Sequence, residues 1–195
     1  MIDAGARVRV LCFTMGEGSS LGKDVSELGR VRAAELMAAA AAIGIDDVIL
    51  LDYPDGGLSG IDMQDLTDHV LAAVGEADAL LVFDEGGVTG HPDHCRATQA
   101  ALLAAAQLGI AVLAWTIPES VASTVNAELG TGLTGRHDND IDLVLHVNRT
   151  RQFQAIACHP TQSTGNQVLA LRLALQGDKE SLRLLAPPRA NDELG

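Results

Sequence analysis

Short apolar runs alternate with longer helix-forming segments along this sequence, and no other feature restricts the fold as much. Four apolar runs have strand length and span residues 7–14, 47–51, 79–83 and 110–117. Segments with helical character separate them, at residues 27–42, 62–74 and 95–108. Strands that alternate with helices of ordinary length are typical of a parallel sheet with right-handed crossovers. We therefore predict an α/β fold.

The remainder of the chain is less regular. Periodicity fades over residues 119–140, where Gly, Thr and Asn multiply, and we expect a long loop or lid there. A strand over 141–147 and a helix over 149–157 follow, and the leucines of 169–175 indicate a tail helix. Residues 187–195 are expected to fray. A length of 195 residues suits a single domain spanning 1–195.

The charge balance restricts the partners. The chain has 13 basic and 26 acidic residues, a formal net charge of −13, which disfavours nucleic acid and anionic membranes and favours a small neutral or cationic ligand. No apolar run approaches the roughly 18 residues of a membrane span, and we expect a cytoplasmic protein. Cys12, Cys95 and Cys158 form no CxxC pair, so buried thiols are expected. The acidic, alanine-rich surface is compatible with a homo-oligomer.

The stretch GGVTGHPDH, residues 86–94, connects a predicted strand to a predicted helix. Such loops lie at the carboxyl ends of parallel strands, where open α/β sheets bind ligands. Pro92 suits the first helical turn, so His91 and His94 share a face, with Asp93 beside them to orient a ring nitrogen or to ligate. A bare HxxH pair is explained equally well by helix capping.

The full string GGVTGHPDH is more specific, because it resembles the second motif of the PIG-L/LmbE family of zinc-dependent N-deacetylases, which act on GlcNAc-type and related amides. This resemblance implies a Rossmann-like, doubly wound, mainly parallel sheet with helices on both faces. It also implies Zn²⁺ as the cofactor and a small N-acyl amino-sugar or amide as the substrate.

Four further matches to the family imply substrate-binding residues. TMGE supplies Glu17, the R-x-x-E pair supplies Arg32, PDG supplies Asp55, and HPTQ, with Thr in place of the family's Ser, supplies His159. Each has a simpler interpretation as well. Glu17 is then a solvated loop acid, Arg32 pairs with Glu35 on the surface, Asp55 belongs to a turn, and His159 is an ordinary loop histidine.

The family's first motif, A-H-P-D-D-E, is absent from this sequence. It supplies two zinc ligands and the general base, so the resemblance leaves His94 as the one zinc ligand present here. His91 would stabilise the oxyanion or protonate the leaving amine, and Asp93 would orient a histidine. Because a catalytic zinc site typically has three protein ligands, the chain as written would bind zinc weakly. Losing the first, central strand would leave backbone groups unpaired, so we expect the natural protein to be longer.

Three hypotheses of function remain open at this point. The first is a zinc-dependent N-deacetylase, an amide hydrolase that releases an acyl group from an amino sugar. The second is a non-catalytic ligand-binding or interaction relative that keeps Glu17, Arg32 and Asp55. The third is a nucleotide-binding domain, suggested by Gly16, Gly18 and Gly22 after the first strand, although the spacing GxGxxxG departs from the dinucleotide pattern.

Overall fold

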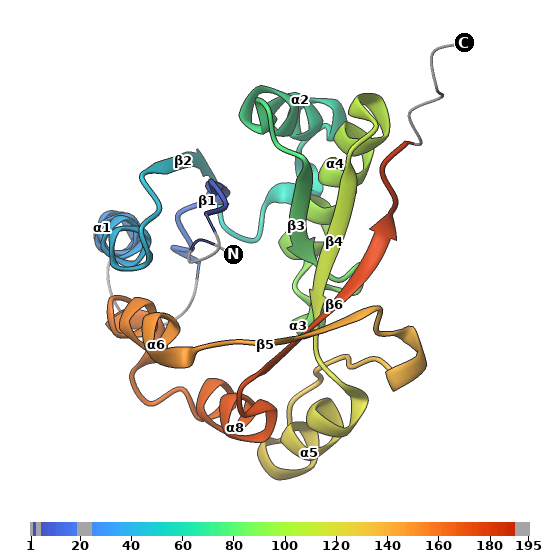
Figure 1. Cartoon of the computed structure of the whole chain (residues 1–195). Helices are drawn as coiled ribbons and strands as arrows, with labels where there is room; N and C mark the ends of the chain where they lie inside the picture. Colours follow the sequence, from blue (N-terminus) through green and yellow to red (C-terminus); the bar gives the residue numbers. More distant parts are fainter. Residues whose placement is uncertain (1, 3–4, 19–24, 190–195) are drawn as a thin grey trace.

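A computed structural model describes residues 2, 5–18 and 25–189 (Figure 1). Its strands are β1 (Arg9–Thr14), β2 (Asp47–Tyr53), β3 (Ala79–Phe83), β4 (Ala111–Thr116), β5 (Leu143–His146) and β6 (Lys179–Ala186). The α-helices are α1 (Val25–Ile43), α2 (Met63–Val74), α3 (Gly87–Gly90), α4 (Pro92–Leu108), α5 (Glu119–Leu129), α6 (Arg149–Ala157), α7 (Pro160–Ser163) and α8 (Gln167–Gln176). Two 3₁₀ turns, η2 (Leu58–Gly60) and η3 (Asp138–Asp140), complete the described elements.

The described strands form two sheets. β1 and β2 are a parallel pair, and the second sheet has the order β3-β4-β6-β5. β3 and β4 are parallel, whereas β6 runs antiparallel to both of its neighbours. The α/β class and the parallel pairs confirm the prediction from the sequence. The antiparallel strand β6 was not predicted.

Residues 179–186 are the main difference from the prediction, because β6 follows the expected tail helix. Leu182 is buried between β4 and β5, opposite Trp115 and Leu143. The chain is also tethered beyond β6. Arg189 donates from its backbone N–H to the Gly109 carbonyl (2.9 Å), so the segment expected to fray is held as far as this residue. Residues 190–195 lie outside the described part of the chain.

The expected long loop over 119–140 is wrong for its first half, which is helix α5. α5 packs against α8, beside it at the bottom of Figure 1. The chain after α5 is fixed by Asn126, whose side-chain oxygen accepts hydrogen bonds from the Thr131 hydroxyl (2.7 Å) and the Leu133 N–H (2.8 Å). Glu119 N–H also donates to the Arg136 carbonyl (2.7 Å). This segment is therefore ordered rather than an open lid.

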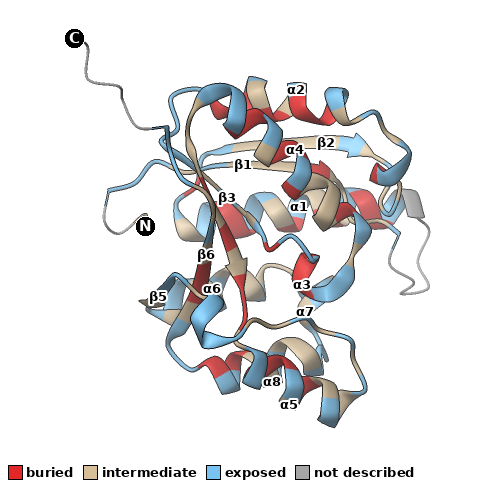
Figure 2. Ribbon diagram, turned by 90° about the vertical axis from the view of Figure 1, so that its right-hand side faces the viewer, coloured by how far each residue is buried: buried red, intermediate tan, exposed pale blue. Residues whose placement is uncertain are grey.

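The largest apolar cluster lies where α2 and α4 pack against β1 and β3 (Figure 2). Ala100 and Ala104 of α4 are fully buried, as is Leu66 of α2. Small alanine side chains let α4 approach α2 and the sheet closely, which fixes the direction of its first turn. Among the described helices, none is both long and apolar enough to cross a bilayer.

Candidate functional site

The loop between β3 and α4 turns sharply before it reaches the two histidines. Gly87 and Gly90 adopt φ angles of 68° and 71°, which favour glycine. A Cβ on Gly87 would lie 3.2 Å from the Cys95 Sγ and 3.3 Å from the His94 Cβ, so a side chain here would crowd the start of α4. Val88 also has a positive φ, of 41°, which is unusual for a β-branched residue. The backbone is therefore strained next to the histidines.

His91 caps α4, because its Nδ1 accepts a hydrogen bond from the Asp93 N–H (3.3 Å) and Pro92 occupies the first helical turn. The capping predicted as an alternative is thus present, and it orients the His91 ring. The rings of His91 and His94 lie 5.0 Å apart between centroids. The loop therefore brings both imidazoles to the same helix start, as the HxxH spacing predicted.

Stacking on an aromatic ring holds the imidazole of His94. The Phe83 ring lies 3.9 Å from it at an interplanar angle of 10°. Its Nδ1 is buried and has no hydrogen-bond partner among the described residues. Burial, and next the charge of His91, hold the pKa of His94 below its ordinary value, against the weaker opposite effects of the Gly87 backbone, Asp93 and Asp55. The lowered pKa favours the neutral imidazole of His94, which is the form that binds metals.

Asp93 has a different set of contacts from the predicted one. Its carboxylate accepts hydrogen bonds from the Gly56 N–H (2.7 Å) and the Leu58 N–H (3.1 Å), and the residue is 5% exposed. The carboxylate thus fastens the loop after β2 to α4, while the backbone of Asp93 orients His91.

Asp55 joins two loops at the edge of the cavity. Its carboxylate accepts hydrogen bonds from the Thr14 hydroxyl (3.3 Å) and the Gly18 N–H (3.0 Å), and its own N–H donates to Glu17 (2.8 Å). Asp55 faces the cavity, whereas Glu17 is not among its described lining residues. The Gly18 amide is occupied by a carboxylate, which disfavours the phosphate-binding hypothesis. Gly22 lies outside the described residues.

Arg32 and Glu35 of α1 are both 7% exposed, so their interpretation as a surface ion pair is wrong. Arg32 donates from Nη1 to the Gly16 carbonyl. Glu35 accepts hydrogen bonds from the Thr161 N–H (3.0 Å) and the Thr161 hydroxyl (2.6 Å), and the His159 Nδ1 lies 3.9 Å from it. α1 therefore anchors both the loop after β1 and helix α7.

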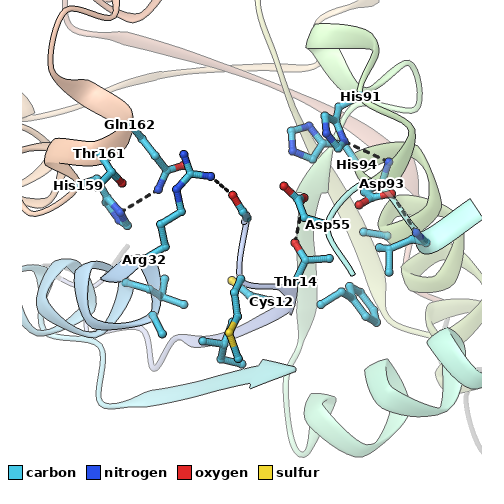
Figure 3. Close-up of a pocket in the computed structure, with 18 of the residues that line it drawn as sticks. Cys12, Thr14, Arg32, Asp55, His91, Asp93, His94, His159, Thr161 and Gln162 are labelled. Carbon is cyan, nitrogen blue, oxygen red and sulfur yellow. Dashed lines mark hydrogen bonds between the residues drawn. The ribbon is translucent and has the colours of Figure 1, made fainter. Parts of the chain in front are cut away.

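These elements enclose a cavity of about 820 Å³, large enough for a substituted sugar. His91, His94 and Asp93 lie on one side of it, and Arg32, His159 and Thr161 on the other, with Asp55 between them (Figure 3). Six of the seven predicted site residues thus line one cavity, the exception being Glu17.

Two of the three histidines outside the cavity are His69 and His137. The His69 Nε2 is hydrogen-bonded to the Tyr53 hydroxyl (3.0 Å), which gives it a packing role on α2. The side chain of His137 is 73% exposed beside Glu119, so it lies at the surface.

Three residues of the site were missed from the sequence. Phe83 stacks on His94, Thr14 donates to Asp55, and Gln162 lines the cavity next to His159. Phe83 ends the strand that leads into the histidine loop, and Gln162 belongs to HPTQ, so position gave a signal for both. Thr14 ends the first predicted strand and begins the TMGE match, so the sequence carried a signal for it as well.

The zinc predicted from the family resemblance has an incomplete ligand set here. The buried, unpartnered Nδ1 and the lowered pKa of His94 suit a metal ligand. However, the described residues contain no group of three His, Cys, Asp or Glu side chains placed to hold a metal ion. Because a catalytic zinc typically takes three protein ligands, the described residues do not form a zinc site by themselves.

The chain is similar in sequence to proteins described as deacetylases. The 1D-myo-inositol 2-acetamido-2-deoxy-alpha-D-glucopyranoside deacetylase of Geodermatophilus obscurus is 30% identical over 130 residues, which cover 53% of this chain and 44% of the relative. The protein of the same description from Mycolicibacterium vanbaalenii is 28% identical over 205 residues, covering 83% and 72%. A probable N-acetyl-alpha-D-glucosaminyl L-malate deacetylase 2 from Bacillus cereus is 31% identical over 102 residues, covering 48% and 46%. The chain thus spans less than half of the first and third of these relatives.

Two solved structures share the fold. The A40926 pseudoaglycone deacetylase Dbv21 superposes with a TM-score of 0.66 at 19% identity, covering 97% of this chain and 89% of that one. GalB, the 4-carboxy-2-hydroxymuconate hydratase of Pseudomonas putida, superposes with a TM-score of 0.63 at 16% identity, covering 100% and 90%. Deacetylases and a hydratase therefore use the same fold, so the fold alone does not fix the reaction.

The family model described as PIG-L, GlcNAc-PI de-N-acetylase, matches residues 1–106. This range includes the histidine loop, Glu17, Arg32 and Asp55, whereas the HPTQ match at His159 lies beyond it. The resemblance is thereby confirmed, and the chain belongs to the PIG-L family.

Proposed function

We propose that this protein is a hydrolase that removes the acyl group from a small N-acylated amino sugar. The observation that carries the proposal is the pair His91 and His94, set at the start of α4 on the wall of a cavity that Arg32, Asp55 and His159 also line. Relatives described as deacetylases of GlcNAc-inositol and GlcNAc-malate support the same reaction class.

The residues divide into two groups across the cavity. A carboxamide is a poor electrophile, and its hydrolysis needs stabilisation of the oxyanion and a proton for the leaving amine. His91, oriented by its cap hydrogen bond, is the group for this work. Asp55, His159 and Arg32 face the other parts of the ligand and orient its hydroxyl groups. Asp93 contributes indirectly, because its carboxylate holds the loop after β2 against α4.

Zinc is part of this proposal through the family resemblance. His94 would be one of its ligands, and a bound Zn²⁺ would act as a Lewis acid and lower the pKa of a bound water. No step is derived through the ion, because the described residues do not complete its ligand set. A cytoplasmic location, inferred from the sequence, also stays part of the proposal.

The test measures acetate release from methyl N-acetylglucosaminide, together with bound zinc, in this chain and in the longest open reading frame that contains it. We expect activity that His94→Ala abolishes and that His91→Ala lowers by about 100-fold or more. Asn126→Ala, whose side chain contacts the 131–133 segment, serves as a control for general loss of stability. An active His94→Ala variant would contradict the assignment.

The incomplete metal set favours one second candidate, a ligand-binding relative without catalysis. The two functions are separated by titrating the protein with glucosamine and N-acetylglucosamine glycosides in a calorimeter. Binding of the sugars with neither acetate release nor stoichiometric zinc would support the binding protein. Turnover at any substrate concentration would exclude it.

A further inference from the structure

Three aromatic rings form a row that ends at the candidate site. Phe83, the last residue of β3, stacks on His94 with 3.9 Å between the ring centroids and an interplanar angle of 10°. Trp115 of β4 pairs with Phe83 in the sheet and meets its ring edge to face, at 6.0 Å and 79°. Such pairs contribute more than the apolar area that they bury. The row therefore connects the second sheet to the start of α4.

Trp115 is fixed in turn by polar groups of later elements. Its Nε1 donates to the Glu180 Oε2 of β6 (2.7 Å). The Arg172 guanidinium of α8 lies 5.0 Å from the ring centroid, within the range of a cation–π contact. Glu180 also pairs with Arg149 of α6. Since β3, β4 and β6 lie side by side in Figure 1, these contacts give Trp115 a firm position next to Phe83.

Packing in the apolar core does not account for an aromatic residue at position 83. Phe83 is 38% exposed and belongs to neither of the described apolar clusters. A large side chain that remains this exposed gains only part of the hydrophobic free energy of its ring. The contact that distinguishes Phe83 is the flat face that it presents to His94.

The plane of the His94 ring matters because an imidazole acts through nitrogens that lie in that plane. The torsion that turns a histidine ring has a broad energy profile, so neighbouring groups must fix it. His91 is fixed by the hydrogen bond from the Asp93 N–H to its Nδ1. For His94, a separation of 3.9 Å leaves no room for the ring to turn against Phe83.

Resting on the proposed deacetylase function, we propose that Phe83, supported by Trp115, is a positioning residue that sets the plane of the His94 imidazole at the cavity wall. It acts through His94 and not on the amide. Without the flat face of Phe83, the imidazole leaves its orientation, while the ligand keeps its contacts with Arg32 and Asp55 across the cavity. The loss should therefore appear in kcat more than in KM.

The first test needs no turnover. In a proton NMR spectrum, the carbon-bound protons of a ring stacked on a phenyl face are shielded, so we expect the His94 ring signals upfield of those of the exposed His137. His94→Ala assigns these signals by their disappearance. Phe83→Leu should move them downfield, to the range of His137. Phe83→Tyr keeps the aromatic face and should leave them in place.

The second test is kinetic and uses methyl N-acetylglucosaminide. We expect Phe83→Leu to lower kcat about tenfold or more with KM within about twofold of the wild type, and Phe83→Tyr to restore kcat to within about twofold. Leu81→Ala is the matched control, because Leu81 lies on the same strand, is 53% exposed and does not line the cavity. It should leave kcat and the His94 signals unchanged. The fluorescence of Trp115, the one tryptophan of the sequence, checks that the Phe83 variants stay folded.

Trp115→Leu tests the support of Phe83. We expect the His94 signals to move part of the way downfield and kcat to fall about threefold.

The outcomes separate the two proposals. Unchanged His94 signals in Phe83→Leu or in Trp115→Leu would overturn this inference, and so would equal losses of kcat in Phe83→Leu and Phe83→Tyr. Absence of acetate release from every form, with the spectral changes as expected, would overturn the deacetylase function and leave the orientation of His94 by Phe83 in place.

Discussion

Asp93 belongs to a motif that resembles a catalytic one, but its carboxylate has a structural role. Its carboxylate receives the N–H groups of Gly56 and Leu58, and Leu58 is 1% exposed. We expect Asp93→Ala to lower the free energy of unfolding by about 1–3 kcal/mol for each amide left unpaired. Asp93→Asn keeps one acceptor oxygen and should lose less. Urea denaturation measures both, and equal losses in the two variants would count against this role.

Asp84, directly after β3, gives the protein an acid-sensitive point. Its side chain is 3% exposed and pairs with Arg136 and Arg183. Burial alone would raise the pKa of Asp84, but the hydrogen bonds from Arg136, the Glu85 backbone and Arg183 outweigh it and hold this pKa below its ordinary value. A carboxyl group with a lowered pKa contributes stability above its unfolded pKa of about 3.9, and this contribution is lost as the pH falls through the folded value.

We therefore expect the free energy of unfolding to fall as the pH drops from about 5 to about 2, and to fall less steeply in Asp84→Asn. At pH 7 the same variant should be less stable by about 3–5 kcal/mol, since two arginines lose their partner. Asp138→Asn, at an exposed position, is the matched control and should keep the wild-type slope. Identical pH slopes in wild type and Asp84→Asn would refute the assignment.

Val88 combines a strained backbone with a buried side chain, which is 2% exposed against Ile117 and Ala122. Val88→Ala and Val88→Gly both remove the two methyl groups with which Val88 packs. Only glycine, however, accommodates the positive φ without strain. We expect the glycine variant to be the more stable of the two by about 1–3 kcal/mol, the reverse of the usual order. Thermal unfolding of both variants decides this, and a more stable alanine variant would show that the strain is absent.

At the scale of elements, the contact between α1 and α7 supports one wall of the cavity. Thr161→Val removes the hydroxyl that donates to Glu35 but keeps the backbone N–H donor. We expect a loss of about 1.5–3 kcal/mol in stability, because the hydrogen bond is charge-assisted. KM should rise more than kcat falls, since His159 and not the amide side of the site loses support. Thr161→Ser retains the hydroxyl and should resemble the wild type in both measurements.

The helices and strands that were predicted correctly are those determined by local signals within their own residues. The boundaries 79–83 and 149–157 agree with β3 and α6, because apolar runs and helical spacing are local signals. α5 was missed because Ser and Thr weaken its pattern, and only its packing on α8 settles the helix. β6 was missed because its pairing with β4 and β5 is a long-range interaction.

The same distinction applies to the site. The HxxH spacing predicted that His91 and His94 share a helix start, since this depends on a single turn. The partners of Asp93, at Gly56 and Leu58, depend on how two loops meet in space. Likewise, no feature near Arg32 and Glu35 in the sequence indicated that both side chains are buried against other elements.

At the scale of the whole molecule, the net charge of −13 is large for 195 residues. Self-repulsion among the acidic groups destabilises the compact state, and salt screens it. We expect the melting temperature to rise by a few degrees as NaCl increases from about 50 mM to about 500 mM. Differential scanning calorimetry measures this rise, with KCl as a control for ion identity. A falling melting temperature would indicate that attractive ion pairs, such as Asp84 with its two arginines, dominate instead.

The position of β6 in its sheet also determines when the sheet can be completed during translation. β5 pairs with β6, and β6 separates it from β4, so the four strands cannot assemble in the order in which the ribosome delivers them. β4 and β5 must wait with open edges for residues 179–186, an interval on the order of seconds at ordinary elongation rates. The nascent chain is therefore most open to chaperone capture in this interval. A ribosome stalled before Lys179 would hold a half-built sheet, while the cluster around α2 and α4 can already have condensed.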